Sequence, residues 1–238
     1  MPLEGKSLAP GTVWVITLDL DQPGEPLDAF AQVLSAEERK RAERLIRDRD
    51  RRRFIVGRGM LRRTLGVALE KDPGRIAFTY AAQGKPTVED RMGTGRSLQF
   101  NLAHSDRLAM LALTVDDPVG IDIERVRPVK LRDGIVRKHF SPVERETFQR
   151  LPEDVRQEAF FRVWTRKEAI VKAIGTGLTL SLTSFDVSLE ARPASALVAM
   201  RHPDYAGEPW SLRALDAPEG FCAALAVARS EPLDVRYL

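Results

Sequence analysis

The chain has 238 residues, of which 43% are hydrophobic and 30% charged, with a formal net charge of +3, which is typical of a globular protein with one large or two modest domains. No apolar run approaches the roughly 20 residues of a membrane helix, and the first residues lack the basic and apolar regions of a secretory signal. A single cysteine, Cys222, and three scattered histidines argue against an internal disulfide and a Cys/His zinc site, so we expect a cytoplasmic protein that uses a hard cation, if any.

The first half of the chain predicts an α+β unit. A Ser-x-x-Glu capping box at 35–38 predicts the start of a helix, and a second helix is expected over 50–69. The strands expected in this half lie at 13–20, 76–80, 98–102 and 108–115. The last two form a predicted hairpin with its turn at 104–106.

Basic residues are concentrated in one segment of this half. Between Arg39 and Arg63 there are twelve basic and three acidic residues, an excess that repels itself without a counter-charge, so we expect an anionic group to meet the segment. A nucleic-acid-binding protein that contacts backbone phosphates with these arginines is one alternative function. That alternative predicts duplex binding that weakens steeply with salt, and it leaves the acidic residues of the second half unexplained.

The second half begins like the first. A capping box recurs at 141–144, and the same 106-residue spacing separates Ser35 from Ser141 and Phe54 from Phe160. Strand-like runs follow at 180–189 and 221–227. We predict two similar α+β halves, 1–117 and 118–238, related by a pseudo-twofold axis with a cleft between them. A coincidence of two common helix caps is the alternative.

Acidic residues recur at strand and helix spacing in the second half. In Val119-Gly120-Ile121-Asp122-Ile123-Glu124, Asp122 and Glu124 would face one way while the isoleucines pack on the other side. Glu168 and Lys172 lie four apart in a helical run and would share one face. Three carboxylates beside a lysine suit Mg²⁺ and a pyrophosphate substrate, although a solvated strand edge and a surface ion pair remain the plain alternatives.

Three motifs, in order, resemble those of the Sfp-type 4′-phosphopantetheinyl transferases, which move phosphopantetheine from coenzyme A to a serine of a carrier protein. The first combines Gln83-Gly84-Lys85-Pro86 with Phe100-Asn101-Leu102-Ala103-His104-Ser105, the second is 120–124, and the third is 164–172. The resemblance implies the α+β fold of that family, in which a pseudo-dimeric monomer binds coenzyme A between its halves. It also implies an apo acyl or peptidyl carrier protein as partner, and neither nucleic acid nor membrane.

The resemblance implies a role for each matched position. Asp122, Glu124 and Glu168 would ligate Mg²⁺, with Mn²⁺ as the alternative, at the coenzyme A pyrophosphate. Glu168 would also be the general base for the carrier serine, and Lys172 would stabilise charge on the pyrophosphate and the departing 3′,5′-ADP. The positions expected to contact coenzyme A are Arg41, Gly84, Lys85, Pro86, His104 and Lys172, to which charge alone adds Arg53 and Arg58.

Two positions depart from the family pattern. Relatives often carry a basic residue at the position of Glu38 and a serine at that of Ala103, so one phosphate contact and one hydroxyl hydrogen bond are expected to be missing or replaced by neighbouring arginines. Carriers of fatty acid, polyketide and nonribosomal peptide synthesis are all compatible with the motifs, and so is acylated coenzyme A as a donor. Another Mg²⁺-dependent enzyme that cleaves pyrophosphates is a second alternative function, which would not require a carrier.

Overall fold

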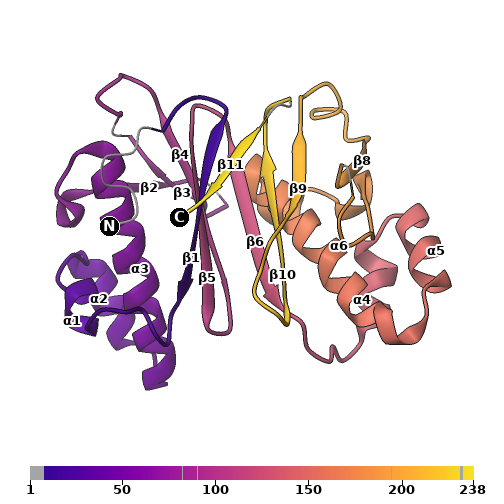
Figure 1. Ribbon diagram of the computed structural model, residues 1–238, viewed down its shortest axis with the longest axis horizontal. Helices are drawn as coiled ribbons and strands as arrows, with labels where there is room; N and C mark the ends of the chain where they lie inside the picture. The colour runs from indigo at the N-terminus through magenta and orange to yellow at the C-terminus, as the bar shows by residue number, and fades with distance from the viewer. Residues whose placement is uncertain (1–7, 82, 90, 194, 231–232) are drawn as a thin grey trace.

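The computed structural model describes residues 8–81, 83–89, 91–193, 195–230 and 233–238 of the chain. Its elements form four layers, in which two sheets face one another and helices cover the outer side of each sheet (Figure 1). One sheet and its helices come largely from the first half of the chain, and the other sheet and its helices come from the second half. The predicted α+β fold with two halves is confirmed.

In the first half, β1 (Thr12–Asp19), β5 (Leu108–Val115) and β4 (Leu98–Ser105) are neighbours in that order. The helices of this half are α1 (Leu27–Ala31), α2 (Ala36–Glu43) and α3 (Asp48–Leu69). The 3-10 helix Pro73–Arg75 and a small hairpin of β2 (Phe78–Tyr80) and β3 (Pro86–Val88) connect α3 to β4. The strand expected from residue 76 therefore begins later, because a helical turn occupies the residues before it.

The second half repeats this order of elements. Strands β6 (Val119–Arg125), β10 (Phe221–Val227) and β9 (Ser211–Leu215) are neighbours as β1, β5 and β4 are. The helices of this half are α4 (Arg132–His139), α5 (Pro142–Arg150) and α6 (Glu153–Ile174). Of the run expected at 180–189, only β7 (Phe185–Val187) is a strand; it pairs with β8 (Leu197–Met200) and follows the 3-10 helices Gly177–Thr179 and Leu182–Ser184. Strand β11 (Asp234–Tyr237) returns to pair with β1 in parallel.

Both predicted capping boxes are present, and each places a glutamate in the core. In each box the serine hydroxyl accepts the N–H of the glutamate, and the glutamate carboxylate accepts the N–H of the serine. Glu38 also accepts a hydrogen bond from Arg62 Nε at 2.5 Å, and Glu144 lies 2.8 Å from Lys167 Nζ. Since a buried carboxylate needs a partner, a cation on the following long helix neutralises each one and ties the two helices together.

The long helices show that one predicted equivalence is wrong. Helices α3 and α6 both have 22 residues, and their ends are 105 residues apart, not 106. Phe54 and Phe160 are therefore not equivalent, and Phe160 is buried whereas Phe54 is partly exposed. Between the capping serine and the long helix there is one residue fewer before α6 than before α3. Among the described residues, no helix combines the length and apolarity needed to cross a membrane.

The hairpin of β4 and β5 is longer than the sequence indicated. Strand β4 continues through Ser105, because His104 and Ser105 both pair with residues of β5. The turn consists of Asp106 and Arg107, and Asp106 has a φ of 51°, in the left-handed region that aspartate tolerates better than most residues. The placement of His104 and Ser105 in the turn is thus wrong. As neighbours in a strand, their side chains point in opposite directions.

The helix layers differ in how closely they approach their sheets. Trp14 of β1 and Gly120 of β6 occupy equivalent positions in the two halves. Each pairs with the sixth residue of the neighbouring strand, which is Leu113 in β5 and Ala226 in β10. Trp14 is buried among apolar side chains that include those of α3, so it separates that helix from β1. Gly120 has no side chain, which lets the backbone of α6 contact β6 directly.

We expect Gly120→Ala to lower the free energy of unfolding by about 3 kcal/mol. The new Cβ would lie 2.1 Å from the carbonyl oxygen of Ala169 and 2.3 Å from the nitrogen of Ala173, and neither backbone atom can move without displacing α6. Urea denaturation measures the change. Gly134→Ala in α4 is the matched control, because its Cβ would meet no atom within 4 Å and should leave stability unchanged or higher. Equal midpoints for Gly120→Ala and the wild type would contradict this packing.

Candidate active site

Strand β6 presents carboxylates to α6 and isoleucines to the first half of the chain. Ile121 and Ile123 are 0% and 1% exposed in the apolar layer between the sheets. Asp122 is 4% exposed and Glu124 is partly exposed, and both share the face on which Gly120 contacts α6. The predicted alternation of side chains along this strand is confirmed.

The close approach of α6 brings a lysine and a third carboxylate to the same place. Lys172 Nζ donates a hydrogen bond to Asp122 Oδ1 at 2.6 Å. Glu168, one helical turn before Lys172, is half-buried and acts electrostatically on Asp122. The structure therefore brings together the four residues that the sequence placed in a catalytic site.

The negative charge of this cluster is not fully balanced by Lys172. Burial raises the pKa of Asp122 to about 7; Lys172 opposes the rise, and Glu124 and Glu168 add to it. Burial also raises the pKa of Glu168. The charge of Lys172 lowers this pKa, and the charge of Glu124 raises it further. Asp122 Oδ2 is buried and has no hydrogen-bond partner. A buried, unpartnered carboxylate oxygen beside other carboxylates is where a further cation would be stabilised.

The three carboxylates do not form a closed group around a metal position. Within the described ranges, no three His, Cys, Asp or Glu side chains are grouped closely enough to hold a metal ion. Glu124 Oε2 accepts a hydrogen bond from Ser105 Oγ at 2.6 Å. The free Oδ2 of Asp122 and the hard oxygen donors nevertheless fit a divalent cation of the Mg²⁺ type. The metal assignment of Asp122, Glu124 and Glu168 stays a prediction.

A cavity of about 580 Å³ lies in the first half, lined by α3, β4 and the segment after β2. Six of the eight positions expected to contact coenzyme A line it: Arg41, Arg53, Arg58, Gly84, Pro86 and His104. Phe54 and Tyr80 line it too. Neither aromatic residue was predicted to lie at the site, although an aromatic residue within a strongly basic helix was an available signal.

A smaller cavity of about 290 Å³ adjoins the first. It is lined by Lys85, Glu168 and Lys172, and it shares Gly84 and Pro86 with the larger cavity. The two cavities therefore meet at the 84–86 loop. All eight positions expected to contact coenzyme A, together with Glu168, line these two adjoining cavities, whereas Asp122 and Glu124 line neither.

His104 projects from β4 into the larger cavity. The ring is more than a third exposed, yet burial by the surrounding protein is the main cause that lowers its pKa. Lys172 and Arg53 lower it further, against the effect of Glu124. The lowered pKa favours the neutral ring of His104, which is suited to donate or accept a hydrogen bond rather than to supply a fixed charge.

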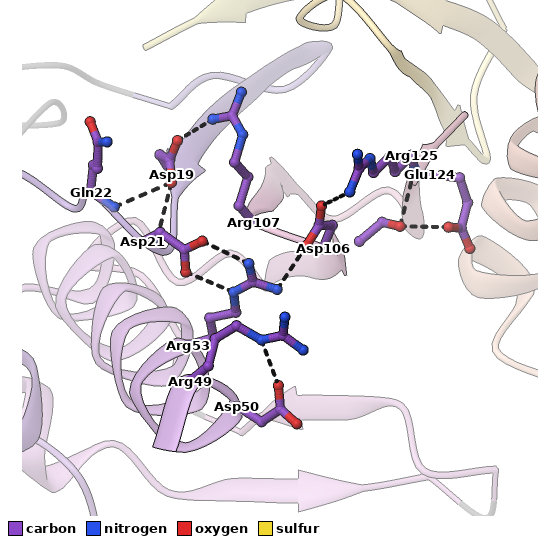
Figure 2. Close-up of polar contacts among 11 residues, drawn as sticks. Asp19, Asp21, Gln22, Arg49, Asp50, Arg53, Asp106, Arg107, Glu124 and Arg125 are labelled. Carbon is purple, nitrogen blue, oxygen red and sulfur yellow. Dashed lines mark hydrogen bonds and ion pairs between the residues drawn. The ribbon is translucent and has the colours of Figure 1, made fainter. Parts of the chain in front are cut away.

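Two arginines of the larger cavity already have carboxylate partners. Arg53 donates two hydrogen bonds to Asp21, each 2.7 Å long, and one to Asp106 at 3.0 Å (Figure 2). Arg58 pairs with Glu38. Glu38 therefore has a structural partner within the basic segment. Relatives often carry a basic residue at this position for a phosphate contact, and here Arg58 lies beside it. Contacts of Arg53 and Arg58 with coenzyme A stay predictions.

Lys85 connects the two halves of the chain. Its Nζ donates hydrogen bonds to the carbonyl oxygens of Val119 at 3.0 Å and Ala173 at 3.1 Å. Burial lowers the pKa of Lys85 to about 8. The side chain therefore fastens the 84–86 loop to β6 and α6, and a contact with a coenzyme A phosphate stays a prediction.

Asp21 and Asp106 were missed by the sequence analysis. They flank the guanidinium of Arg53 from the end of β1 and from the turn after β4 (Figure 2). Hydrogen bonds from Arg53 are the main cause that lowers the pKa of Asp21. The available signal was the excess of arginines at 39–63, which required carboxylates from elsewhere in the chain.

The chain is similar to known proteins over most of its length. A family model described as the 4′-phosphopantetheinyl transferase superfamily matches residues 118–226, and one described as 4′-phosphopantetheinyl transferase, N-terminal, matches residues 23–116. The 4′-phosphopantetheinyl transferase HetI of Nostoc sp. is 38% identical over 212 residues, which cover 89% of this chain and 85% of that protein. The 4′-phosphopantetheinyl transferase Sfp of Bacillus subtilis is 27% identical over 94% of this chain and 95% of that protein.

Among solved structures, the crystal structure of Thermotoga maritima holo-[acyl-carrier-protein] synthase has a TM-score of 0.39 and 24% identity, and the match covers 48% of this chain and 64% of that one. The family models and the relatives agree with the family that the three motifs indicated. The chain therefore belongs to the 4′-phosphopantetheinyl transferase superfamily, as an Sfp-type enzyme that transfers phosphopantetheine from coenzyme A to carrier proteins.

Proposed function

We propose that coenzyme A occupies the 580 Å³ cavity, with its pyrophosphate at the adjoining cavity that Glu168 and Lys172 line. The observation that carries this proposal is the junction of the two cavities at the 84–86 loop. Arg41 is exposed, and its guanidinium lies 5.3 Å from the centre of the Phe54 ring, which leaves its charge available to a phosphate. His104 would hydrogen-bond the same ligand from the opposite wall of the cavity.

Asp122, Glu124 and Glu168 would hold Mg²⁺, or Mn²⁺ in its place. When bound, the ion would neutralise the pyrophosphate and polarise its phosphorus centre. The unpartnered Oδ2 of Asp122 and the raised pKa of that carboxyl group support this assignment. The same ion would lower the pKa of Asp122, because it favours the charged form.

The transfer exchanges one phosphorus–oxygen bond for another. The hydroxyl oxygen of the carrier serine attacks the β-phosphorus of coenzyme A, and the bond from that phosphorus to the bridging oxygen breaks. 3′,5′-ADP leaves with the bonding electron pair. Glu168 takes the serine proton, directly or through a water molecule.

Lys172 would stabilise the charge that develops on the departing oxygens. Its ammonium group is 2.6 Å from Asp122 Oδ1, and the side chain is 30% exposed and lines the smaller cavity, so Lys172 lies at the rim of the cluster. The acceptor is an apo acyl or peptidyl carrier protein. We place the reaction in the cytoplasm and assign the active form as a monomer, since both halves of the site come from one chain.

The release of 3′,5′-ADP tests this proposal against the two alternatives. Chromatography of coenzyme A incubated with the protein, Mg²⁺ and an apo carrier should show 3′,5′-ADP only when the carrier is present. Equal release without the carrier would favour a pyrophosphate-cleaving enzyme instead. Strong retention of the protein on duplex DNA at low salt, with no 3′,5′-ADP in any mixture, would favour the nucleic-acid-binding alternative.

A further inference from the structure

Strands β4 and β6 lie side by side across the boundary between the halves, but they belong to different sheets. Strand β4 carries His104 of the coenzyme A cavity, and β6 carries Asp122 and Glu124. Since the strands are not paired in a common sheet, the usual backbone ladder does not set their relative position. Other contacts must set the register between these two parts of the site.

Two polar side chains of β4 make these contacts. Asn101 Oδ1 accepts the backbone N–H of Ile121 at 2.9 Å, and Ser105 Oγ accepts the backbone N–H of Arg125 at 3.1 Å. Both side chains are four residues apart on β4, and the two amides are four residues apart on β6. Asn101 and Ser105 are only 6% and 8% exposed, so water does not compete strongly for either bond. The anchored amides bracket the segment that holds both carboxylates.

Ser105 makes a second contact, with a carboxylate of the candidate metal site. Its hydroxyl donates to Glu124 Oε2 at 2.6 Å while accepting the N–H of Arg125. One hydroxyl therefore fixes both the backbone of β6 and the side-chain orientation of Glu124. A short hydrogen bond between a hydroxyl and a carboxyl group is among the stronger ones in proteins.

An ion-pair chain holds the turn that follows Ser105. Asp106 accepts hydrogen bonds from Arg125 Nη1 at 2.5 Å and from Arg53 Nη1 at 3.0 Å, and Arg53 in turn binds Asp21 (Figure 2). These ion pairs link the end of β1 and α3, through the turn, to the end of β6. They restrain the turn on both sides, so that Ser105 has one position relative to Glu124.

We propose that Asn101 and Ser105 are positioning residues of the transferase, which hold the carboxylate strand β6 in register with the coenzyme A strand β4, and that Ser105 also orients Glu124 for metal binding. This role rests on the proposed assignment of Glu124 as a metal ligand. Groups that orient a metal ligand commonly change metal affinity by 10- to 100-fold when removed. Ser105 lines neither cavity, whereas Asn101 also lines the smaller cavity proposed for the pyrophosphate.

The test compares Ser105→Ala with the wild type in two measurements. Mn²⁺ binding is followed by the electron paramagnetic resonance of the free ion, and amide hydrogen exchange is followed at Ile121 and Arg125. We expect Ser105→Ala to bind Mn²⁺ about tenfold more weakly and to lose protection at the Arg125 amide, while coenzyme A binding in EDTA changes less than twofold. Ser105→Thr, which keeps the hydroxyl, should restore both properties.

Thr114→Val is the matched control, because it removes a buried hydroxyl that donates to the carbonyl oxygen of Thr12 within the first half. It should lower the melting temperature without changing Mn²⁺ affinity. Unchanged exchange at Arg125 in Ser105→Ala, or an equal loss of Mn²⁺ affinity in Thr114→Val, would overturn the positioning role. If Glu124→Gln binds Mn²⁺ like the wild type, the metal assignment fails, and exchange at Arg125 alone decides the role of Ser105.

Discussion

Asp122→Asn is expected to abolish transfer and, at the same time, to raise the melting temperature of the protein in EDTA at pH 8. Burial raises the pKa of this carboxyl group from 3.8 to about 7, so the folded state binds its proton more tightly than the unfolded state does. Ionised Asp122 therefore lowers the free energy of unfolding. This destabilisation is fully present above pH 7 and declines as the pH falls toward 4. Asparagine has the same shape and carries no such penalty.

The predicted gain for Asp122→Asn is about 5 °C at pH 8, from a penalty on the order of a few kcal/mol, and it should shrink toward pH 5. Thermal denaturation at both pH values measures it, and a carrier assay with Mg²⁺ should show a loss of more than about 10³-fold in rate. Transfer at the wild-type rate would remove Asp122 from the site. A difference in melting temperature that is equal at the two pH values would contradict the buried-charge explanation.

Glu168→Gln should lower the rate of transfer by about 10³-fold while coenzyme A binding in EDTA changes less than twofold. The substitution removes the proposed proton acceptor and a proposed metal ligand, but it keeps the side-chain volume in the half-buried position on α6. Single-turnover kinetics with a saturating apo carrier measure the chemical step, and calorimetry measures coenzyme A binding.

Glu158→Gln provides the control for Glu168→Gln on the same helix. Its carboxylate is 59% exposed and pairs with Arg162 four residues later, away from the smaller cavity. This variant should transfer at the wild-type rate, since an exposed helical ion pair contributes little. A loss common to both variants would mean that any charge change on α6 impairs the enzyme, and that Glu168 has no particular role.

Local sequence patterns predicted the parts of the site that depend on short spacing. The two-residue period on β6 placed Asp122 and Glu124 on one face, and the four-residue period on α6 placed Glu168 beside Lys172. The two capping boxes were also visible, because each is complete within four residues. These features depend on backbone geometry that neighbouring residues determine almost alone.

Contacts between distant residues were not visible in the same way. The partners of Arg53 lie at Asp21 and Asp106, and nothing in the residues around Arg53 identifies them. The extension of β4 through Ser105 depends on pairing with β5, whereas serine and aspartate, the residue types at 105 and 106, are common in turns. The shared spacing of Phe54 and Phe160 was misleading, because the segment from the capping serine to α6 is one residue shorter than the segment from the capping serine to α3. Only the positions of the helix ends reveal this difference.

The two halves have the same order of elements, but the carboxylates lie in one of them. Through the pairing with β5 and β10, the positions of Asp122 and Glu124 in β6 correspond to Ile16 and Leu18 in β1. Trp14 replaces Gly120 at the point where the helix meets the sheet. The first half therefore keeps its helix apart from its strand and contributes the larger cavity, while the second half brings α6 onto β6 and contributes the charged cluster.

Intact-mass spectrometry of apo carrier proteins is the most direct test of metal-dependent transfer of phosphopantetheine to a carrier serine. A panel of acyl and peptidyl carriers is incubated with the protein, coenzyme A and Mg²⁺, beside an EDTA control and carriers whose acceptor serine is replaced by alanine. We expect a gain of one phosphopantetheine, about 340 Da, on at least one carrier, and no gain with EDTA or in the alanine carriers. A gain that persists in EDTA would contradict the metal site, and a gain on the alanine carriers would contradict transfer to serine.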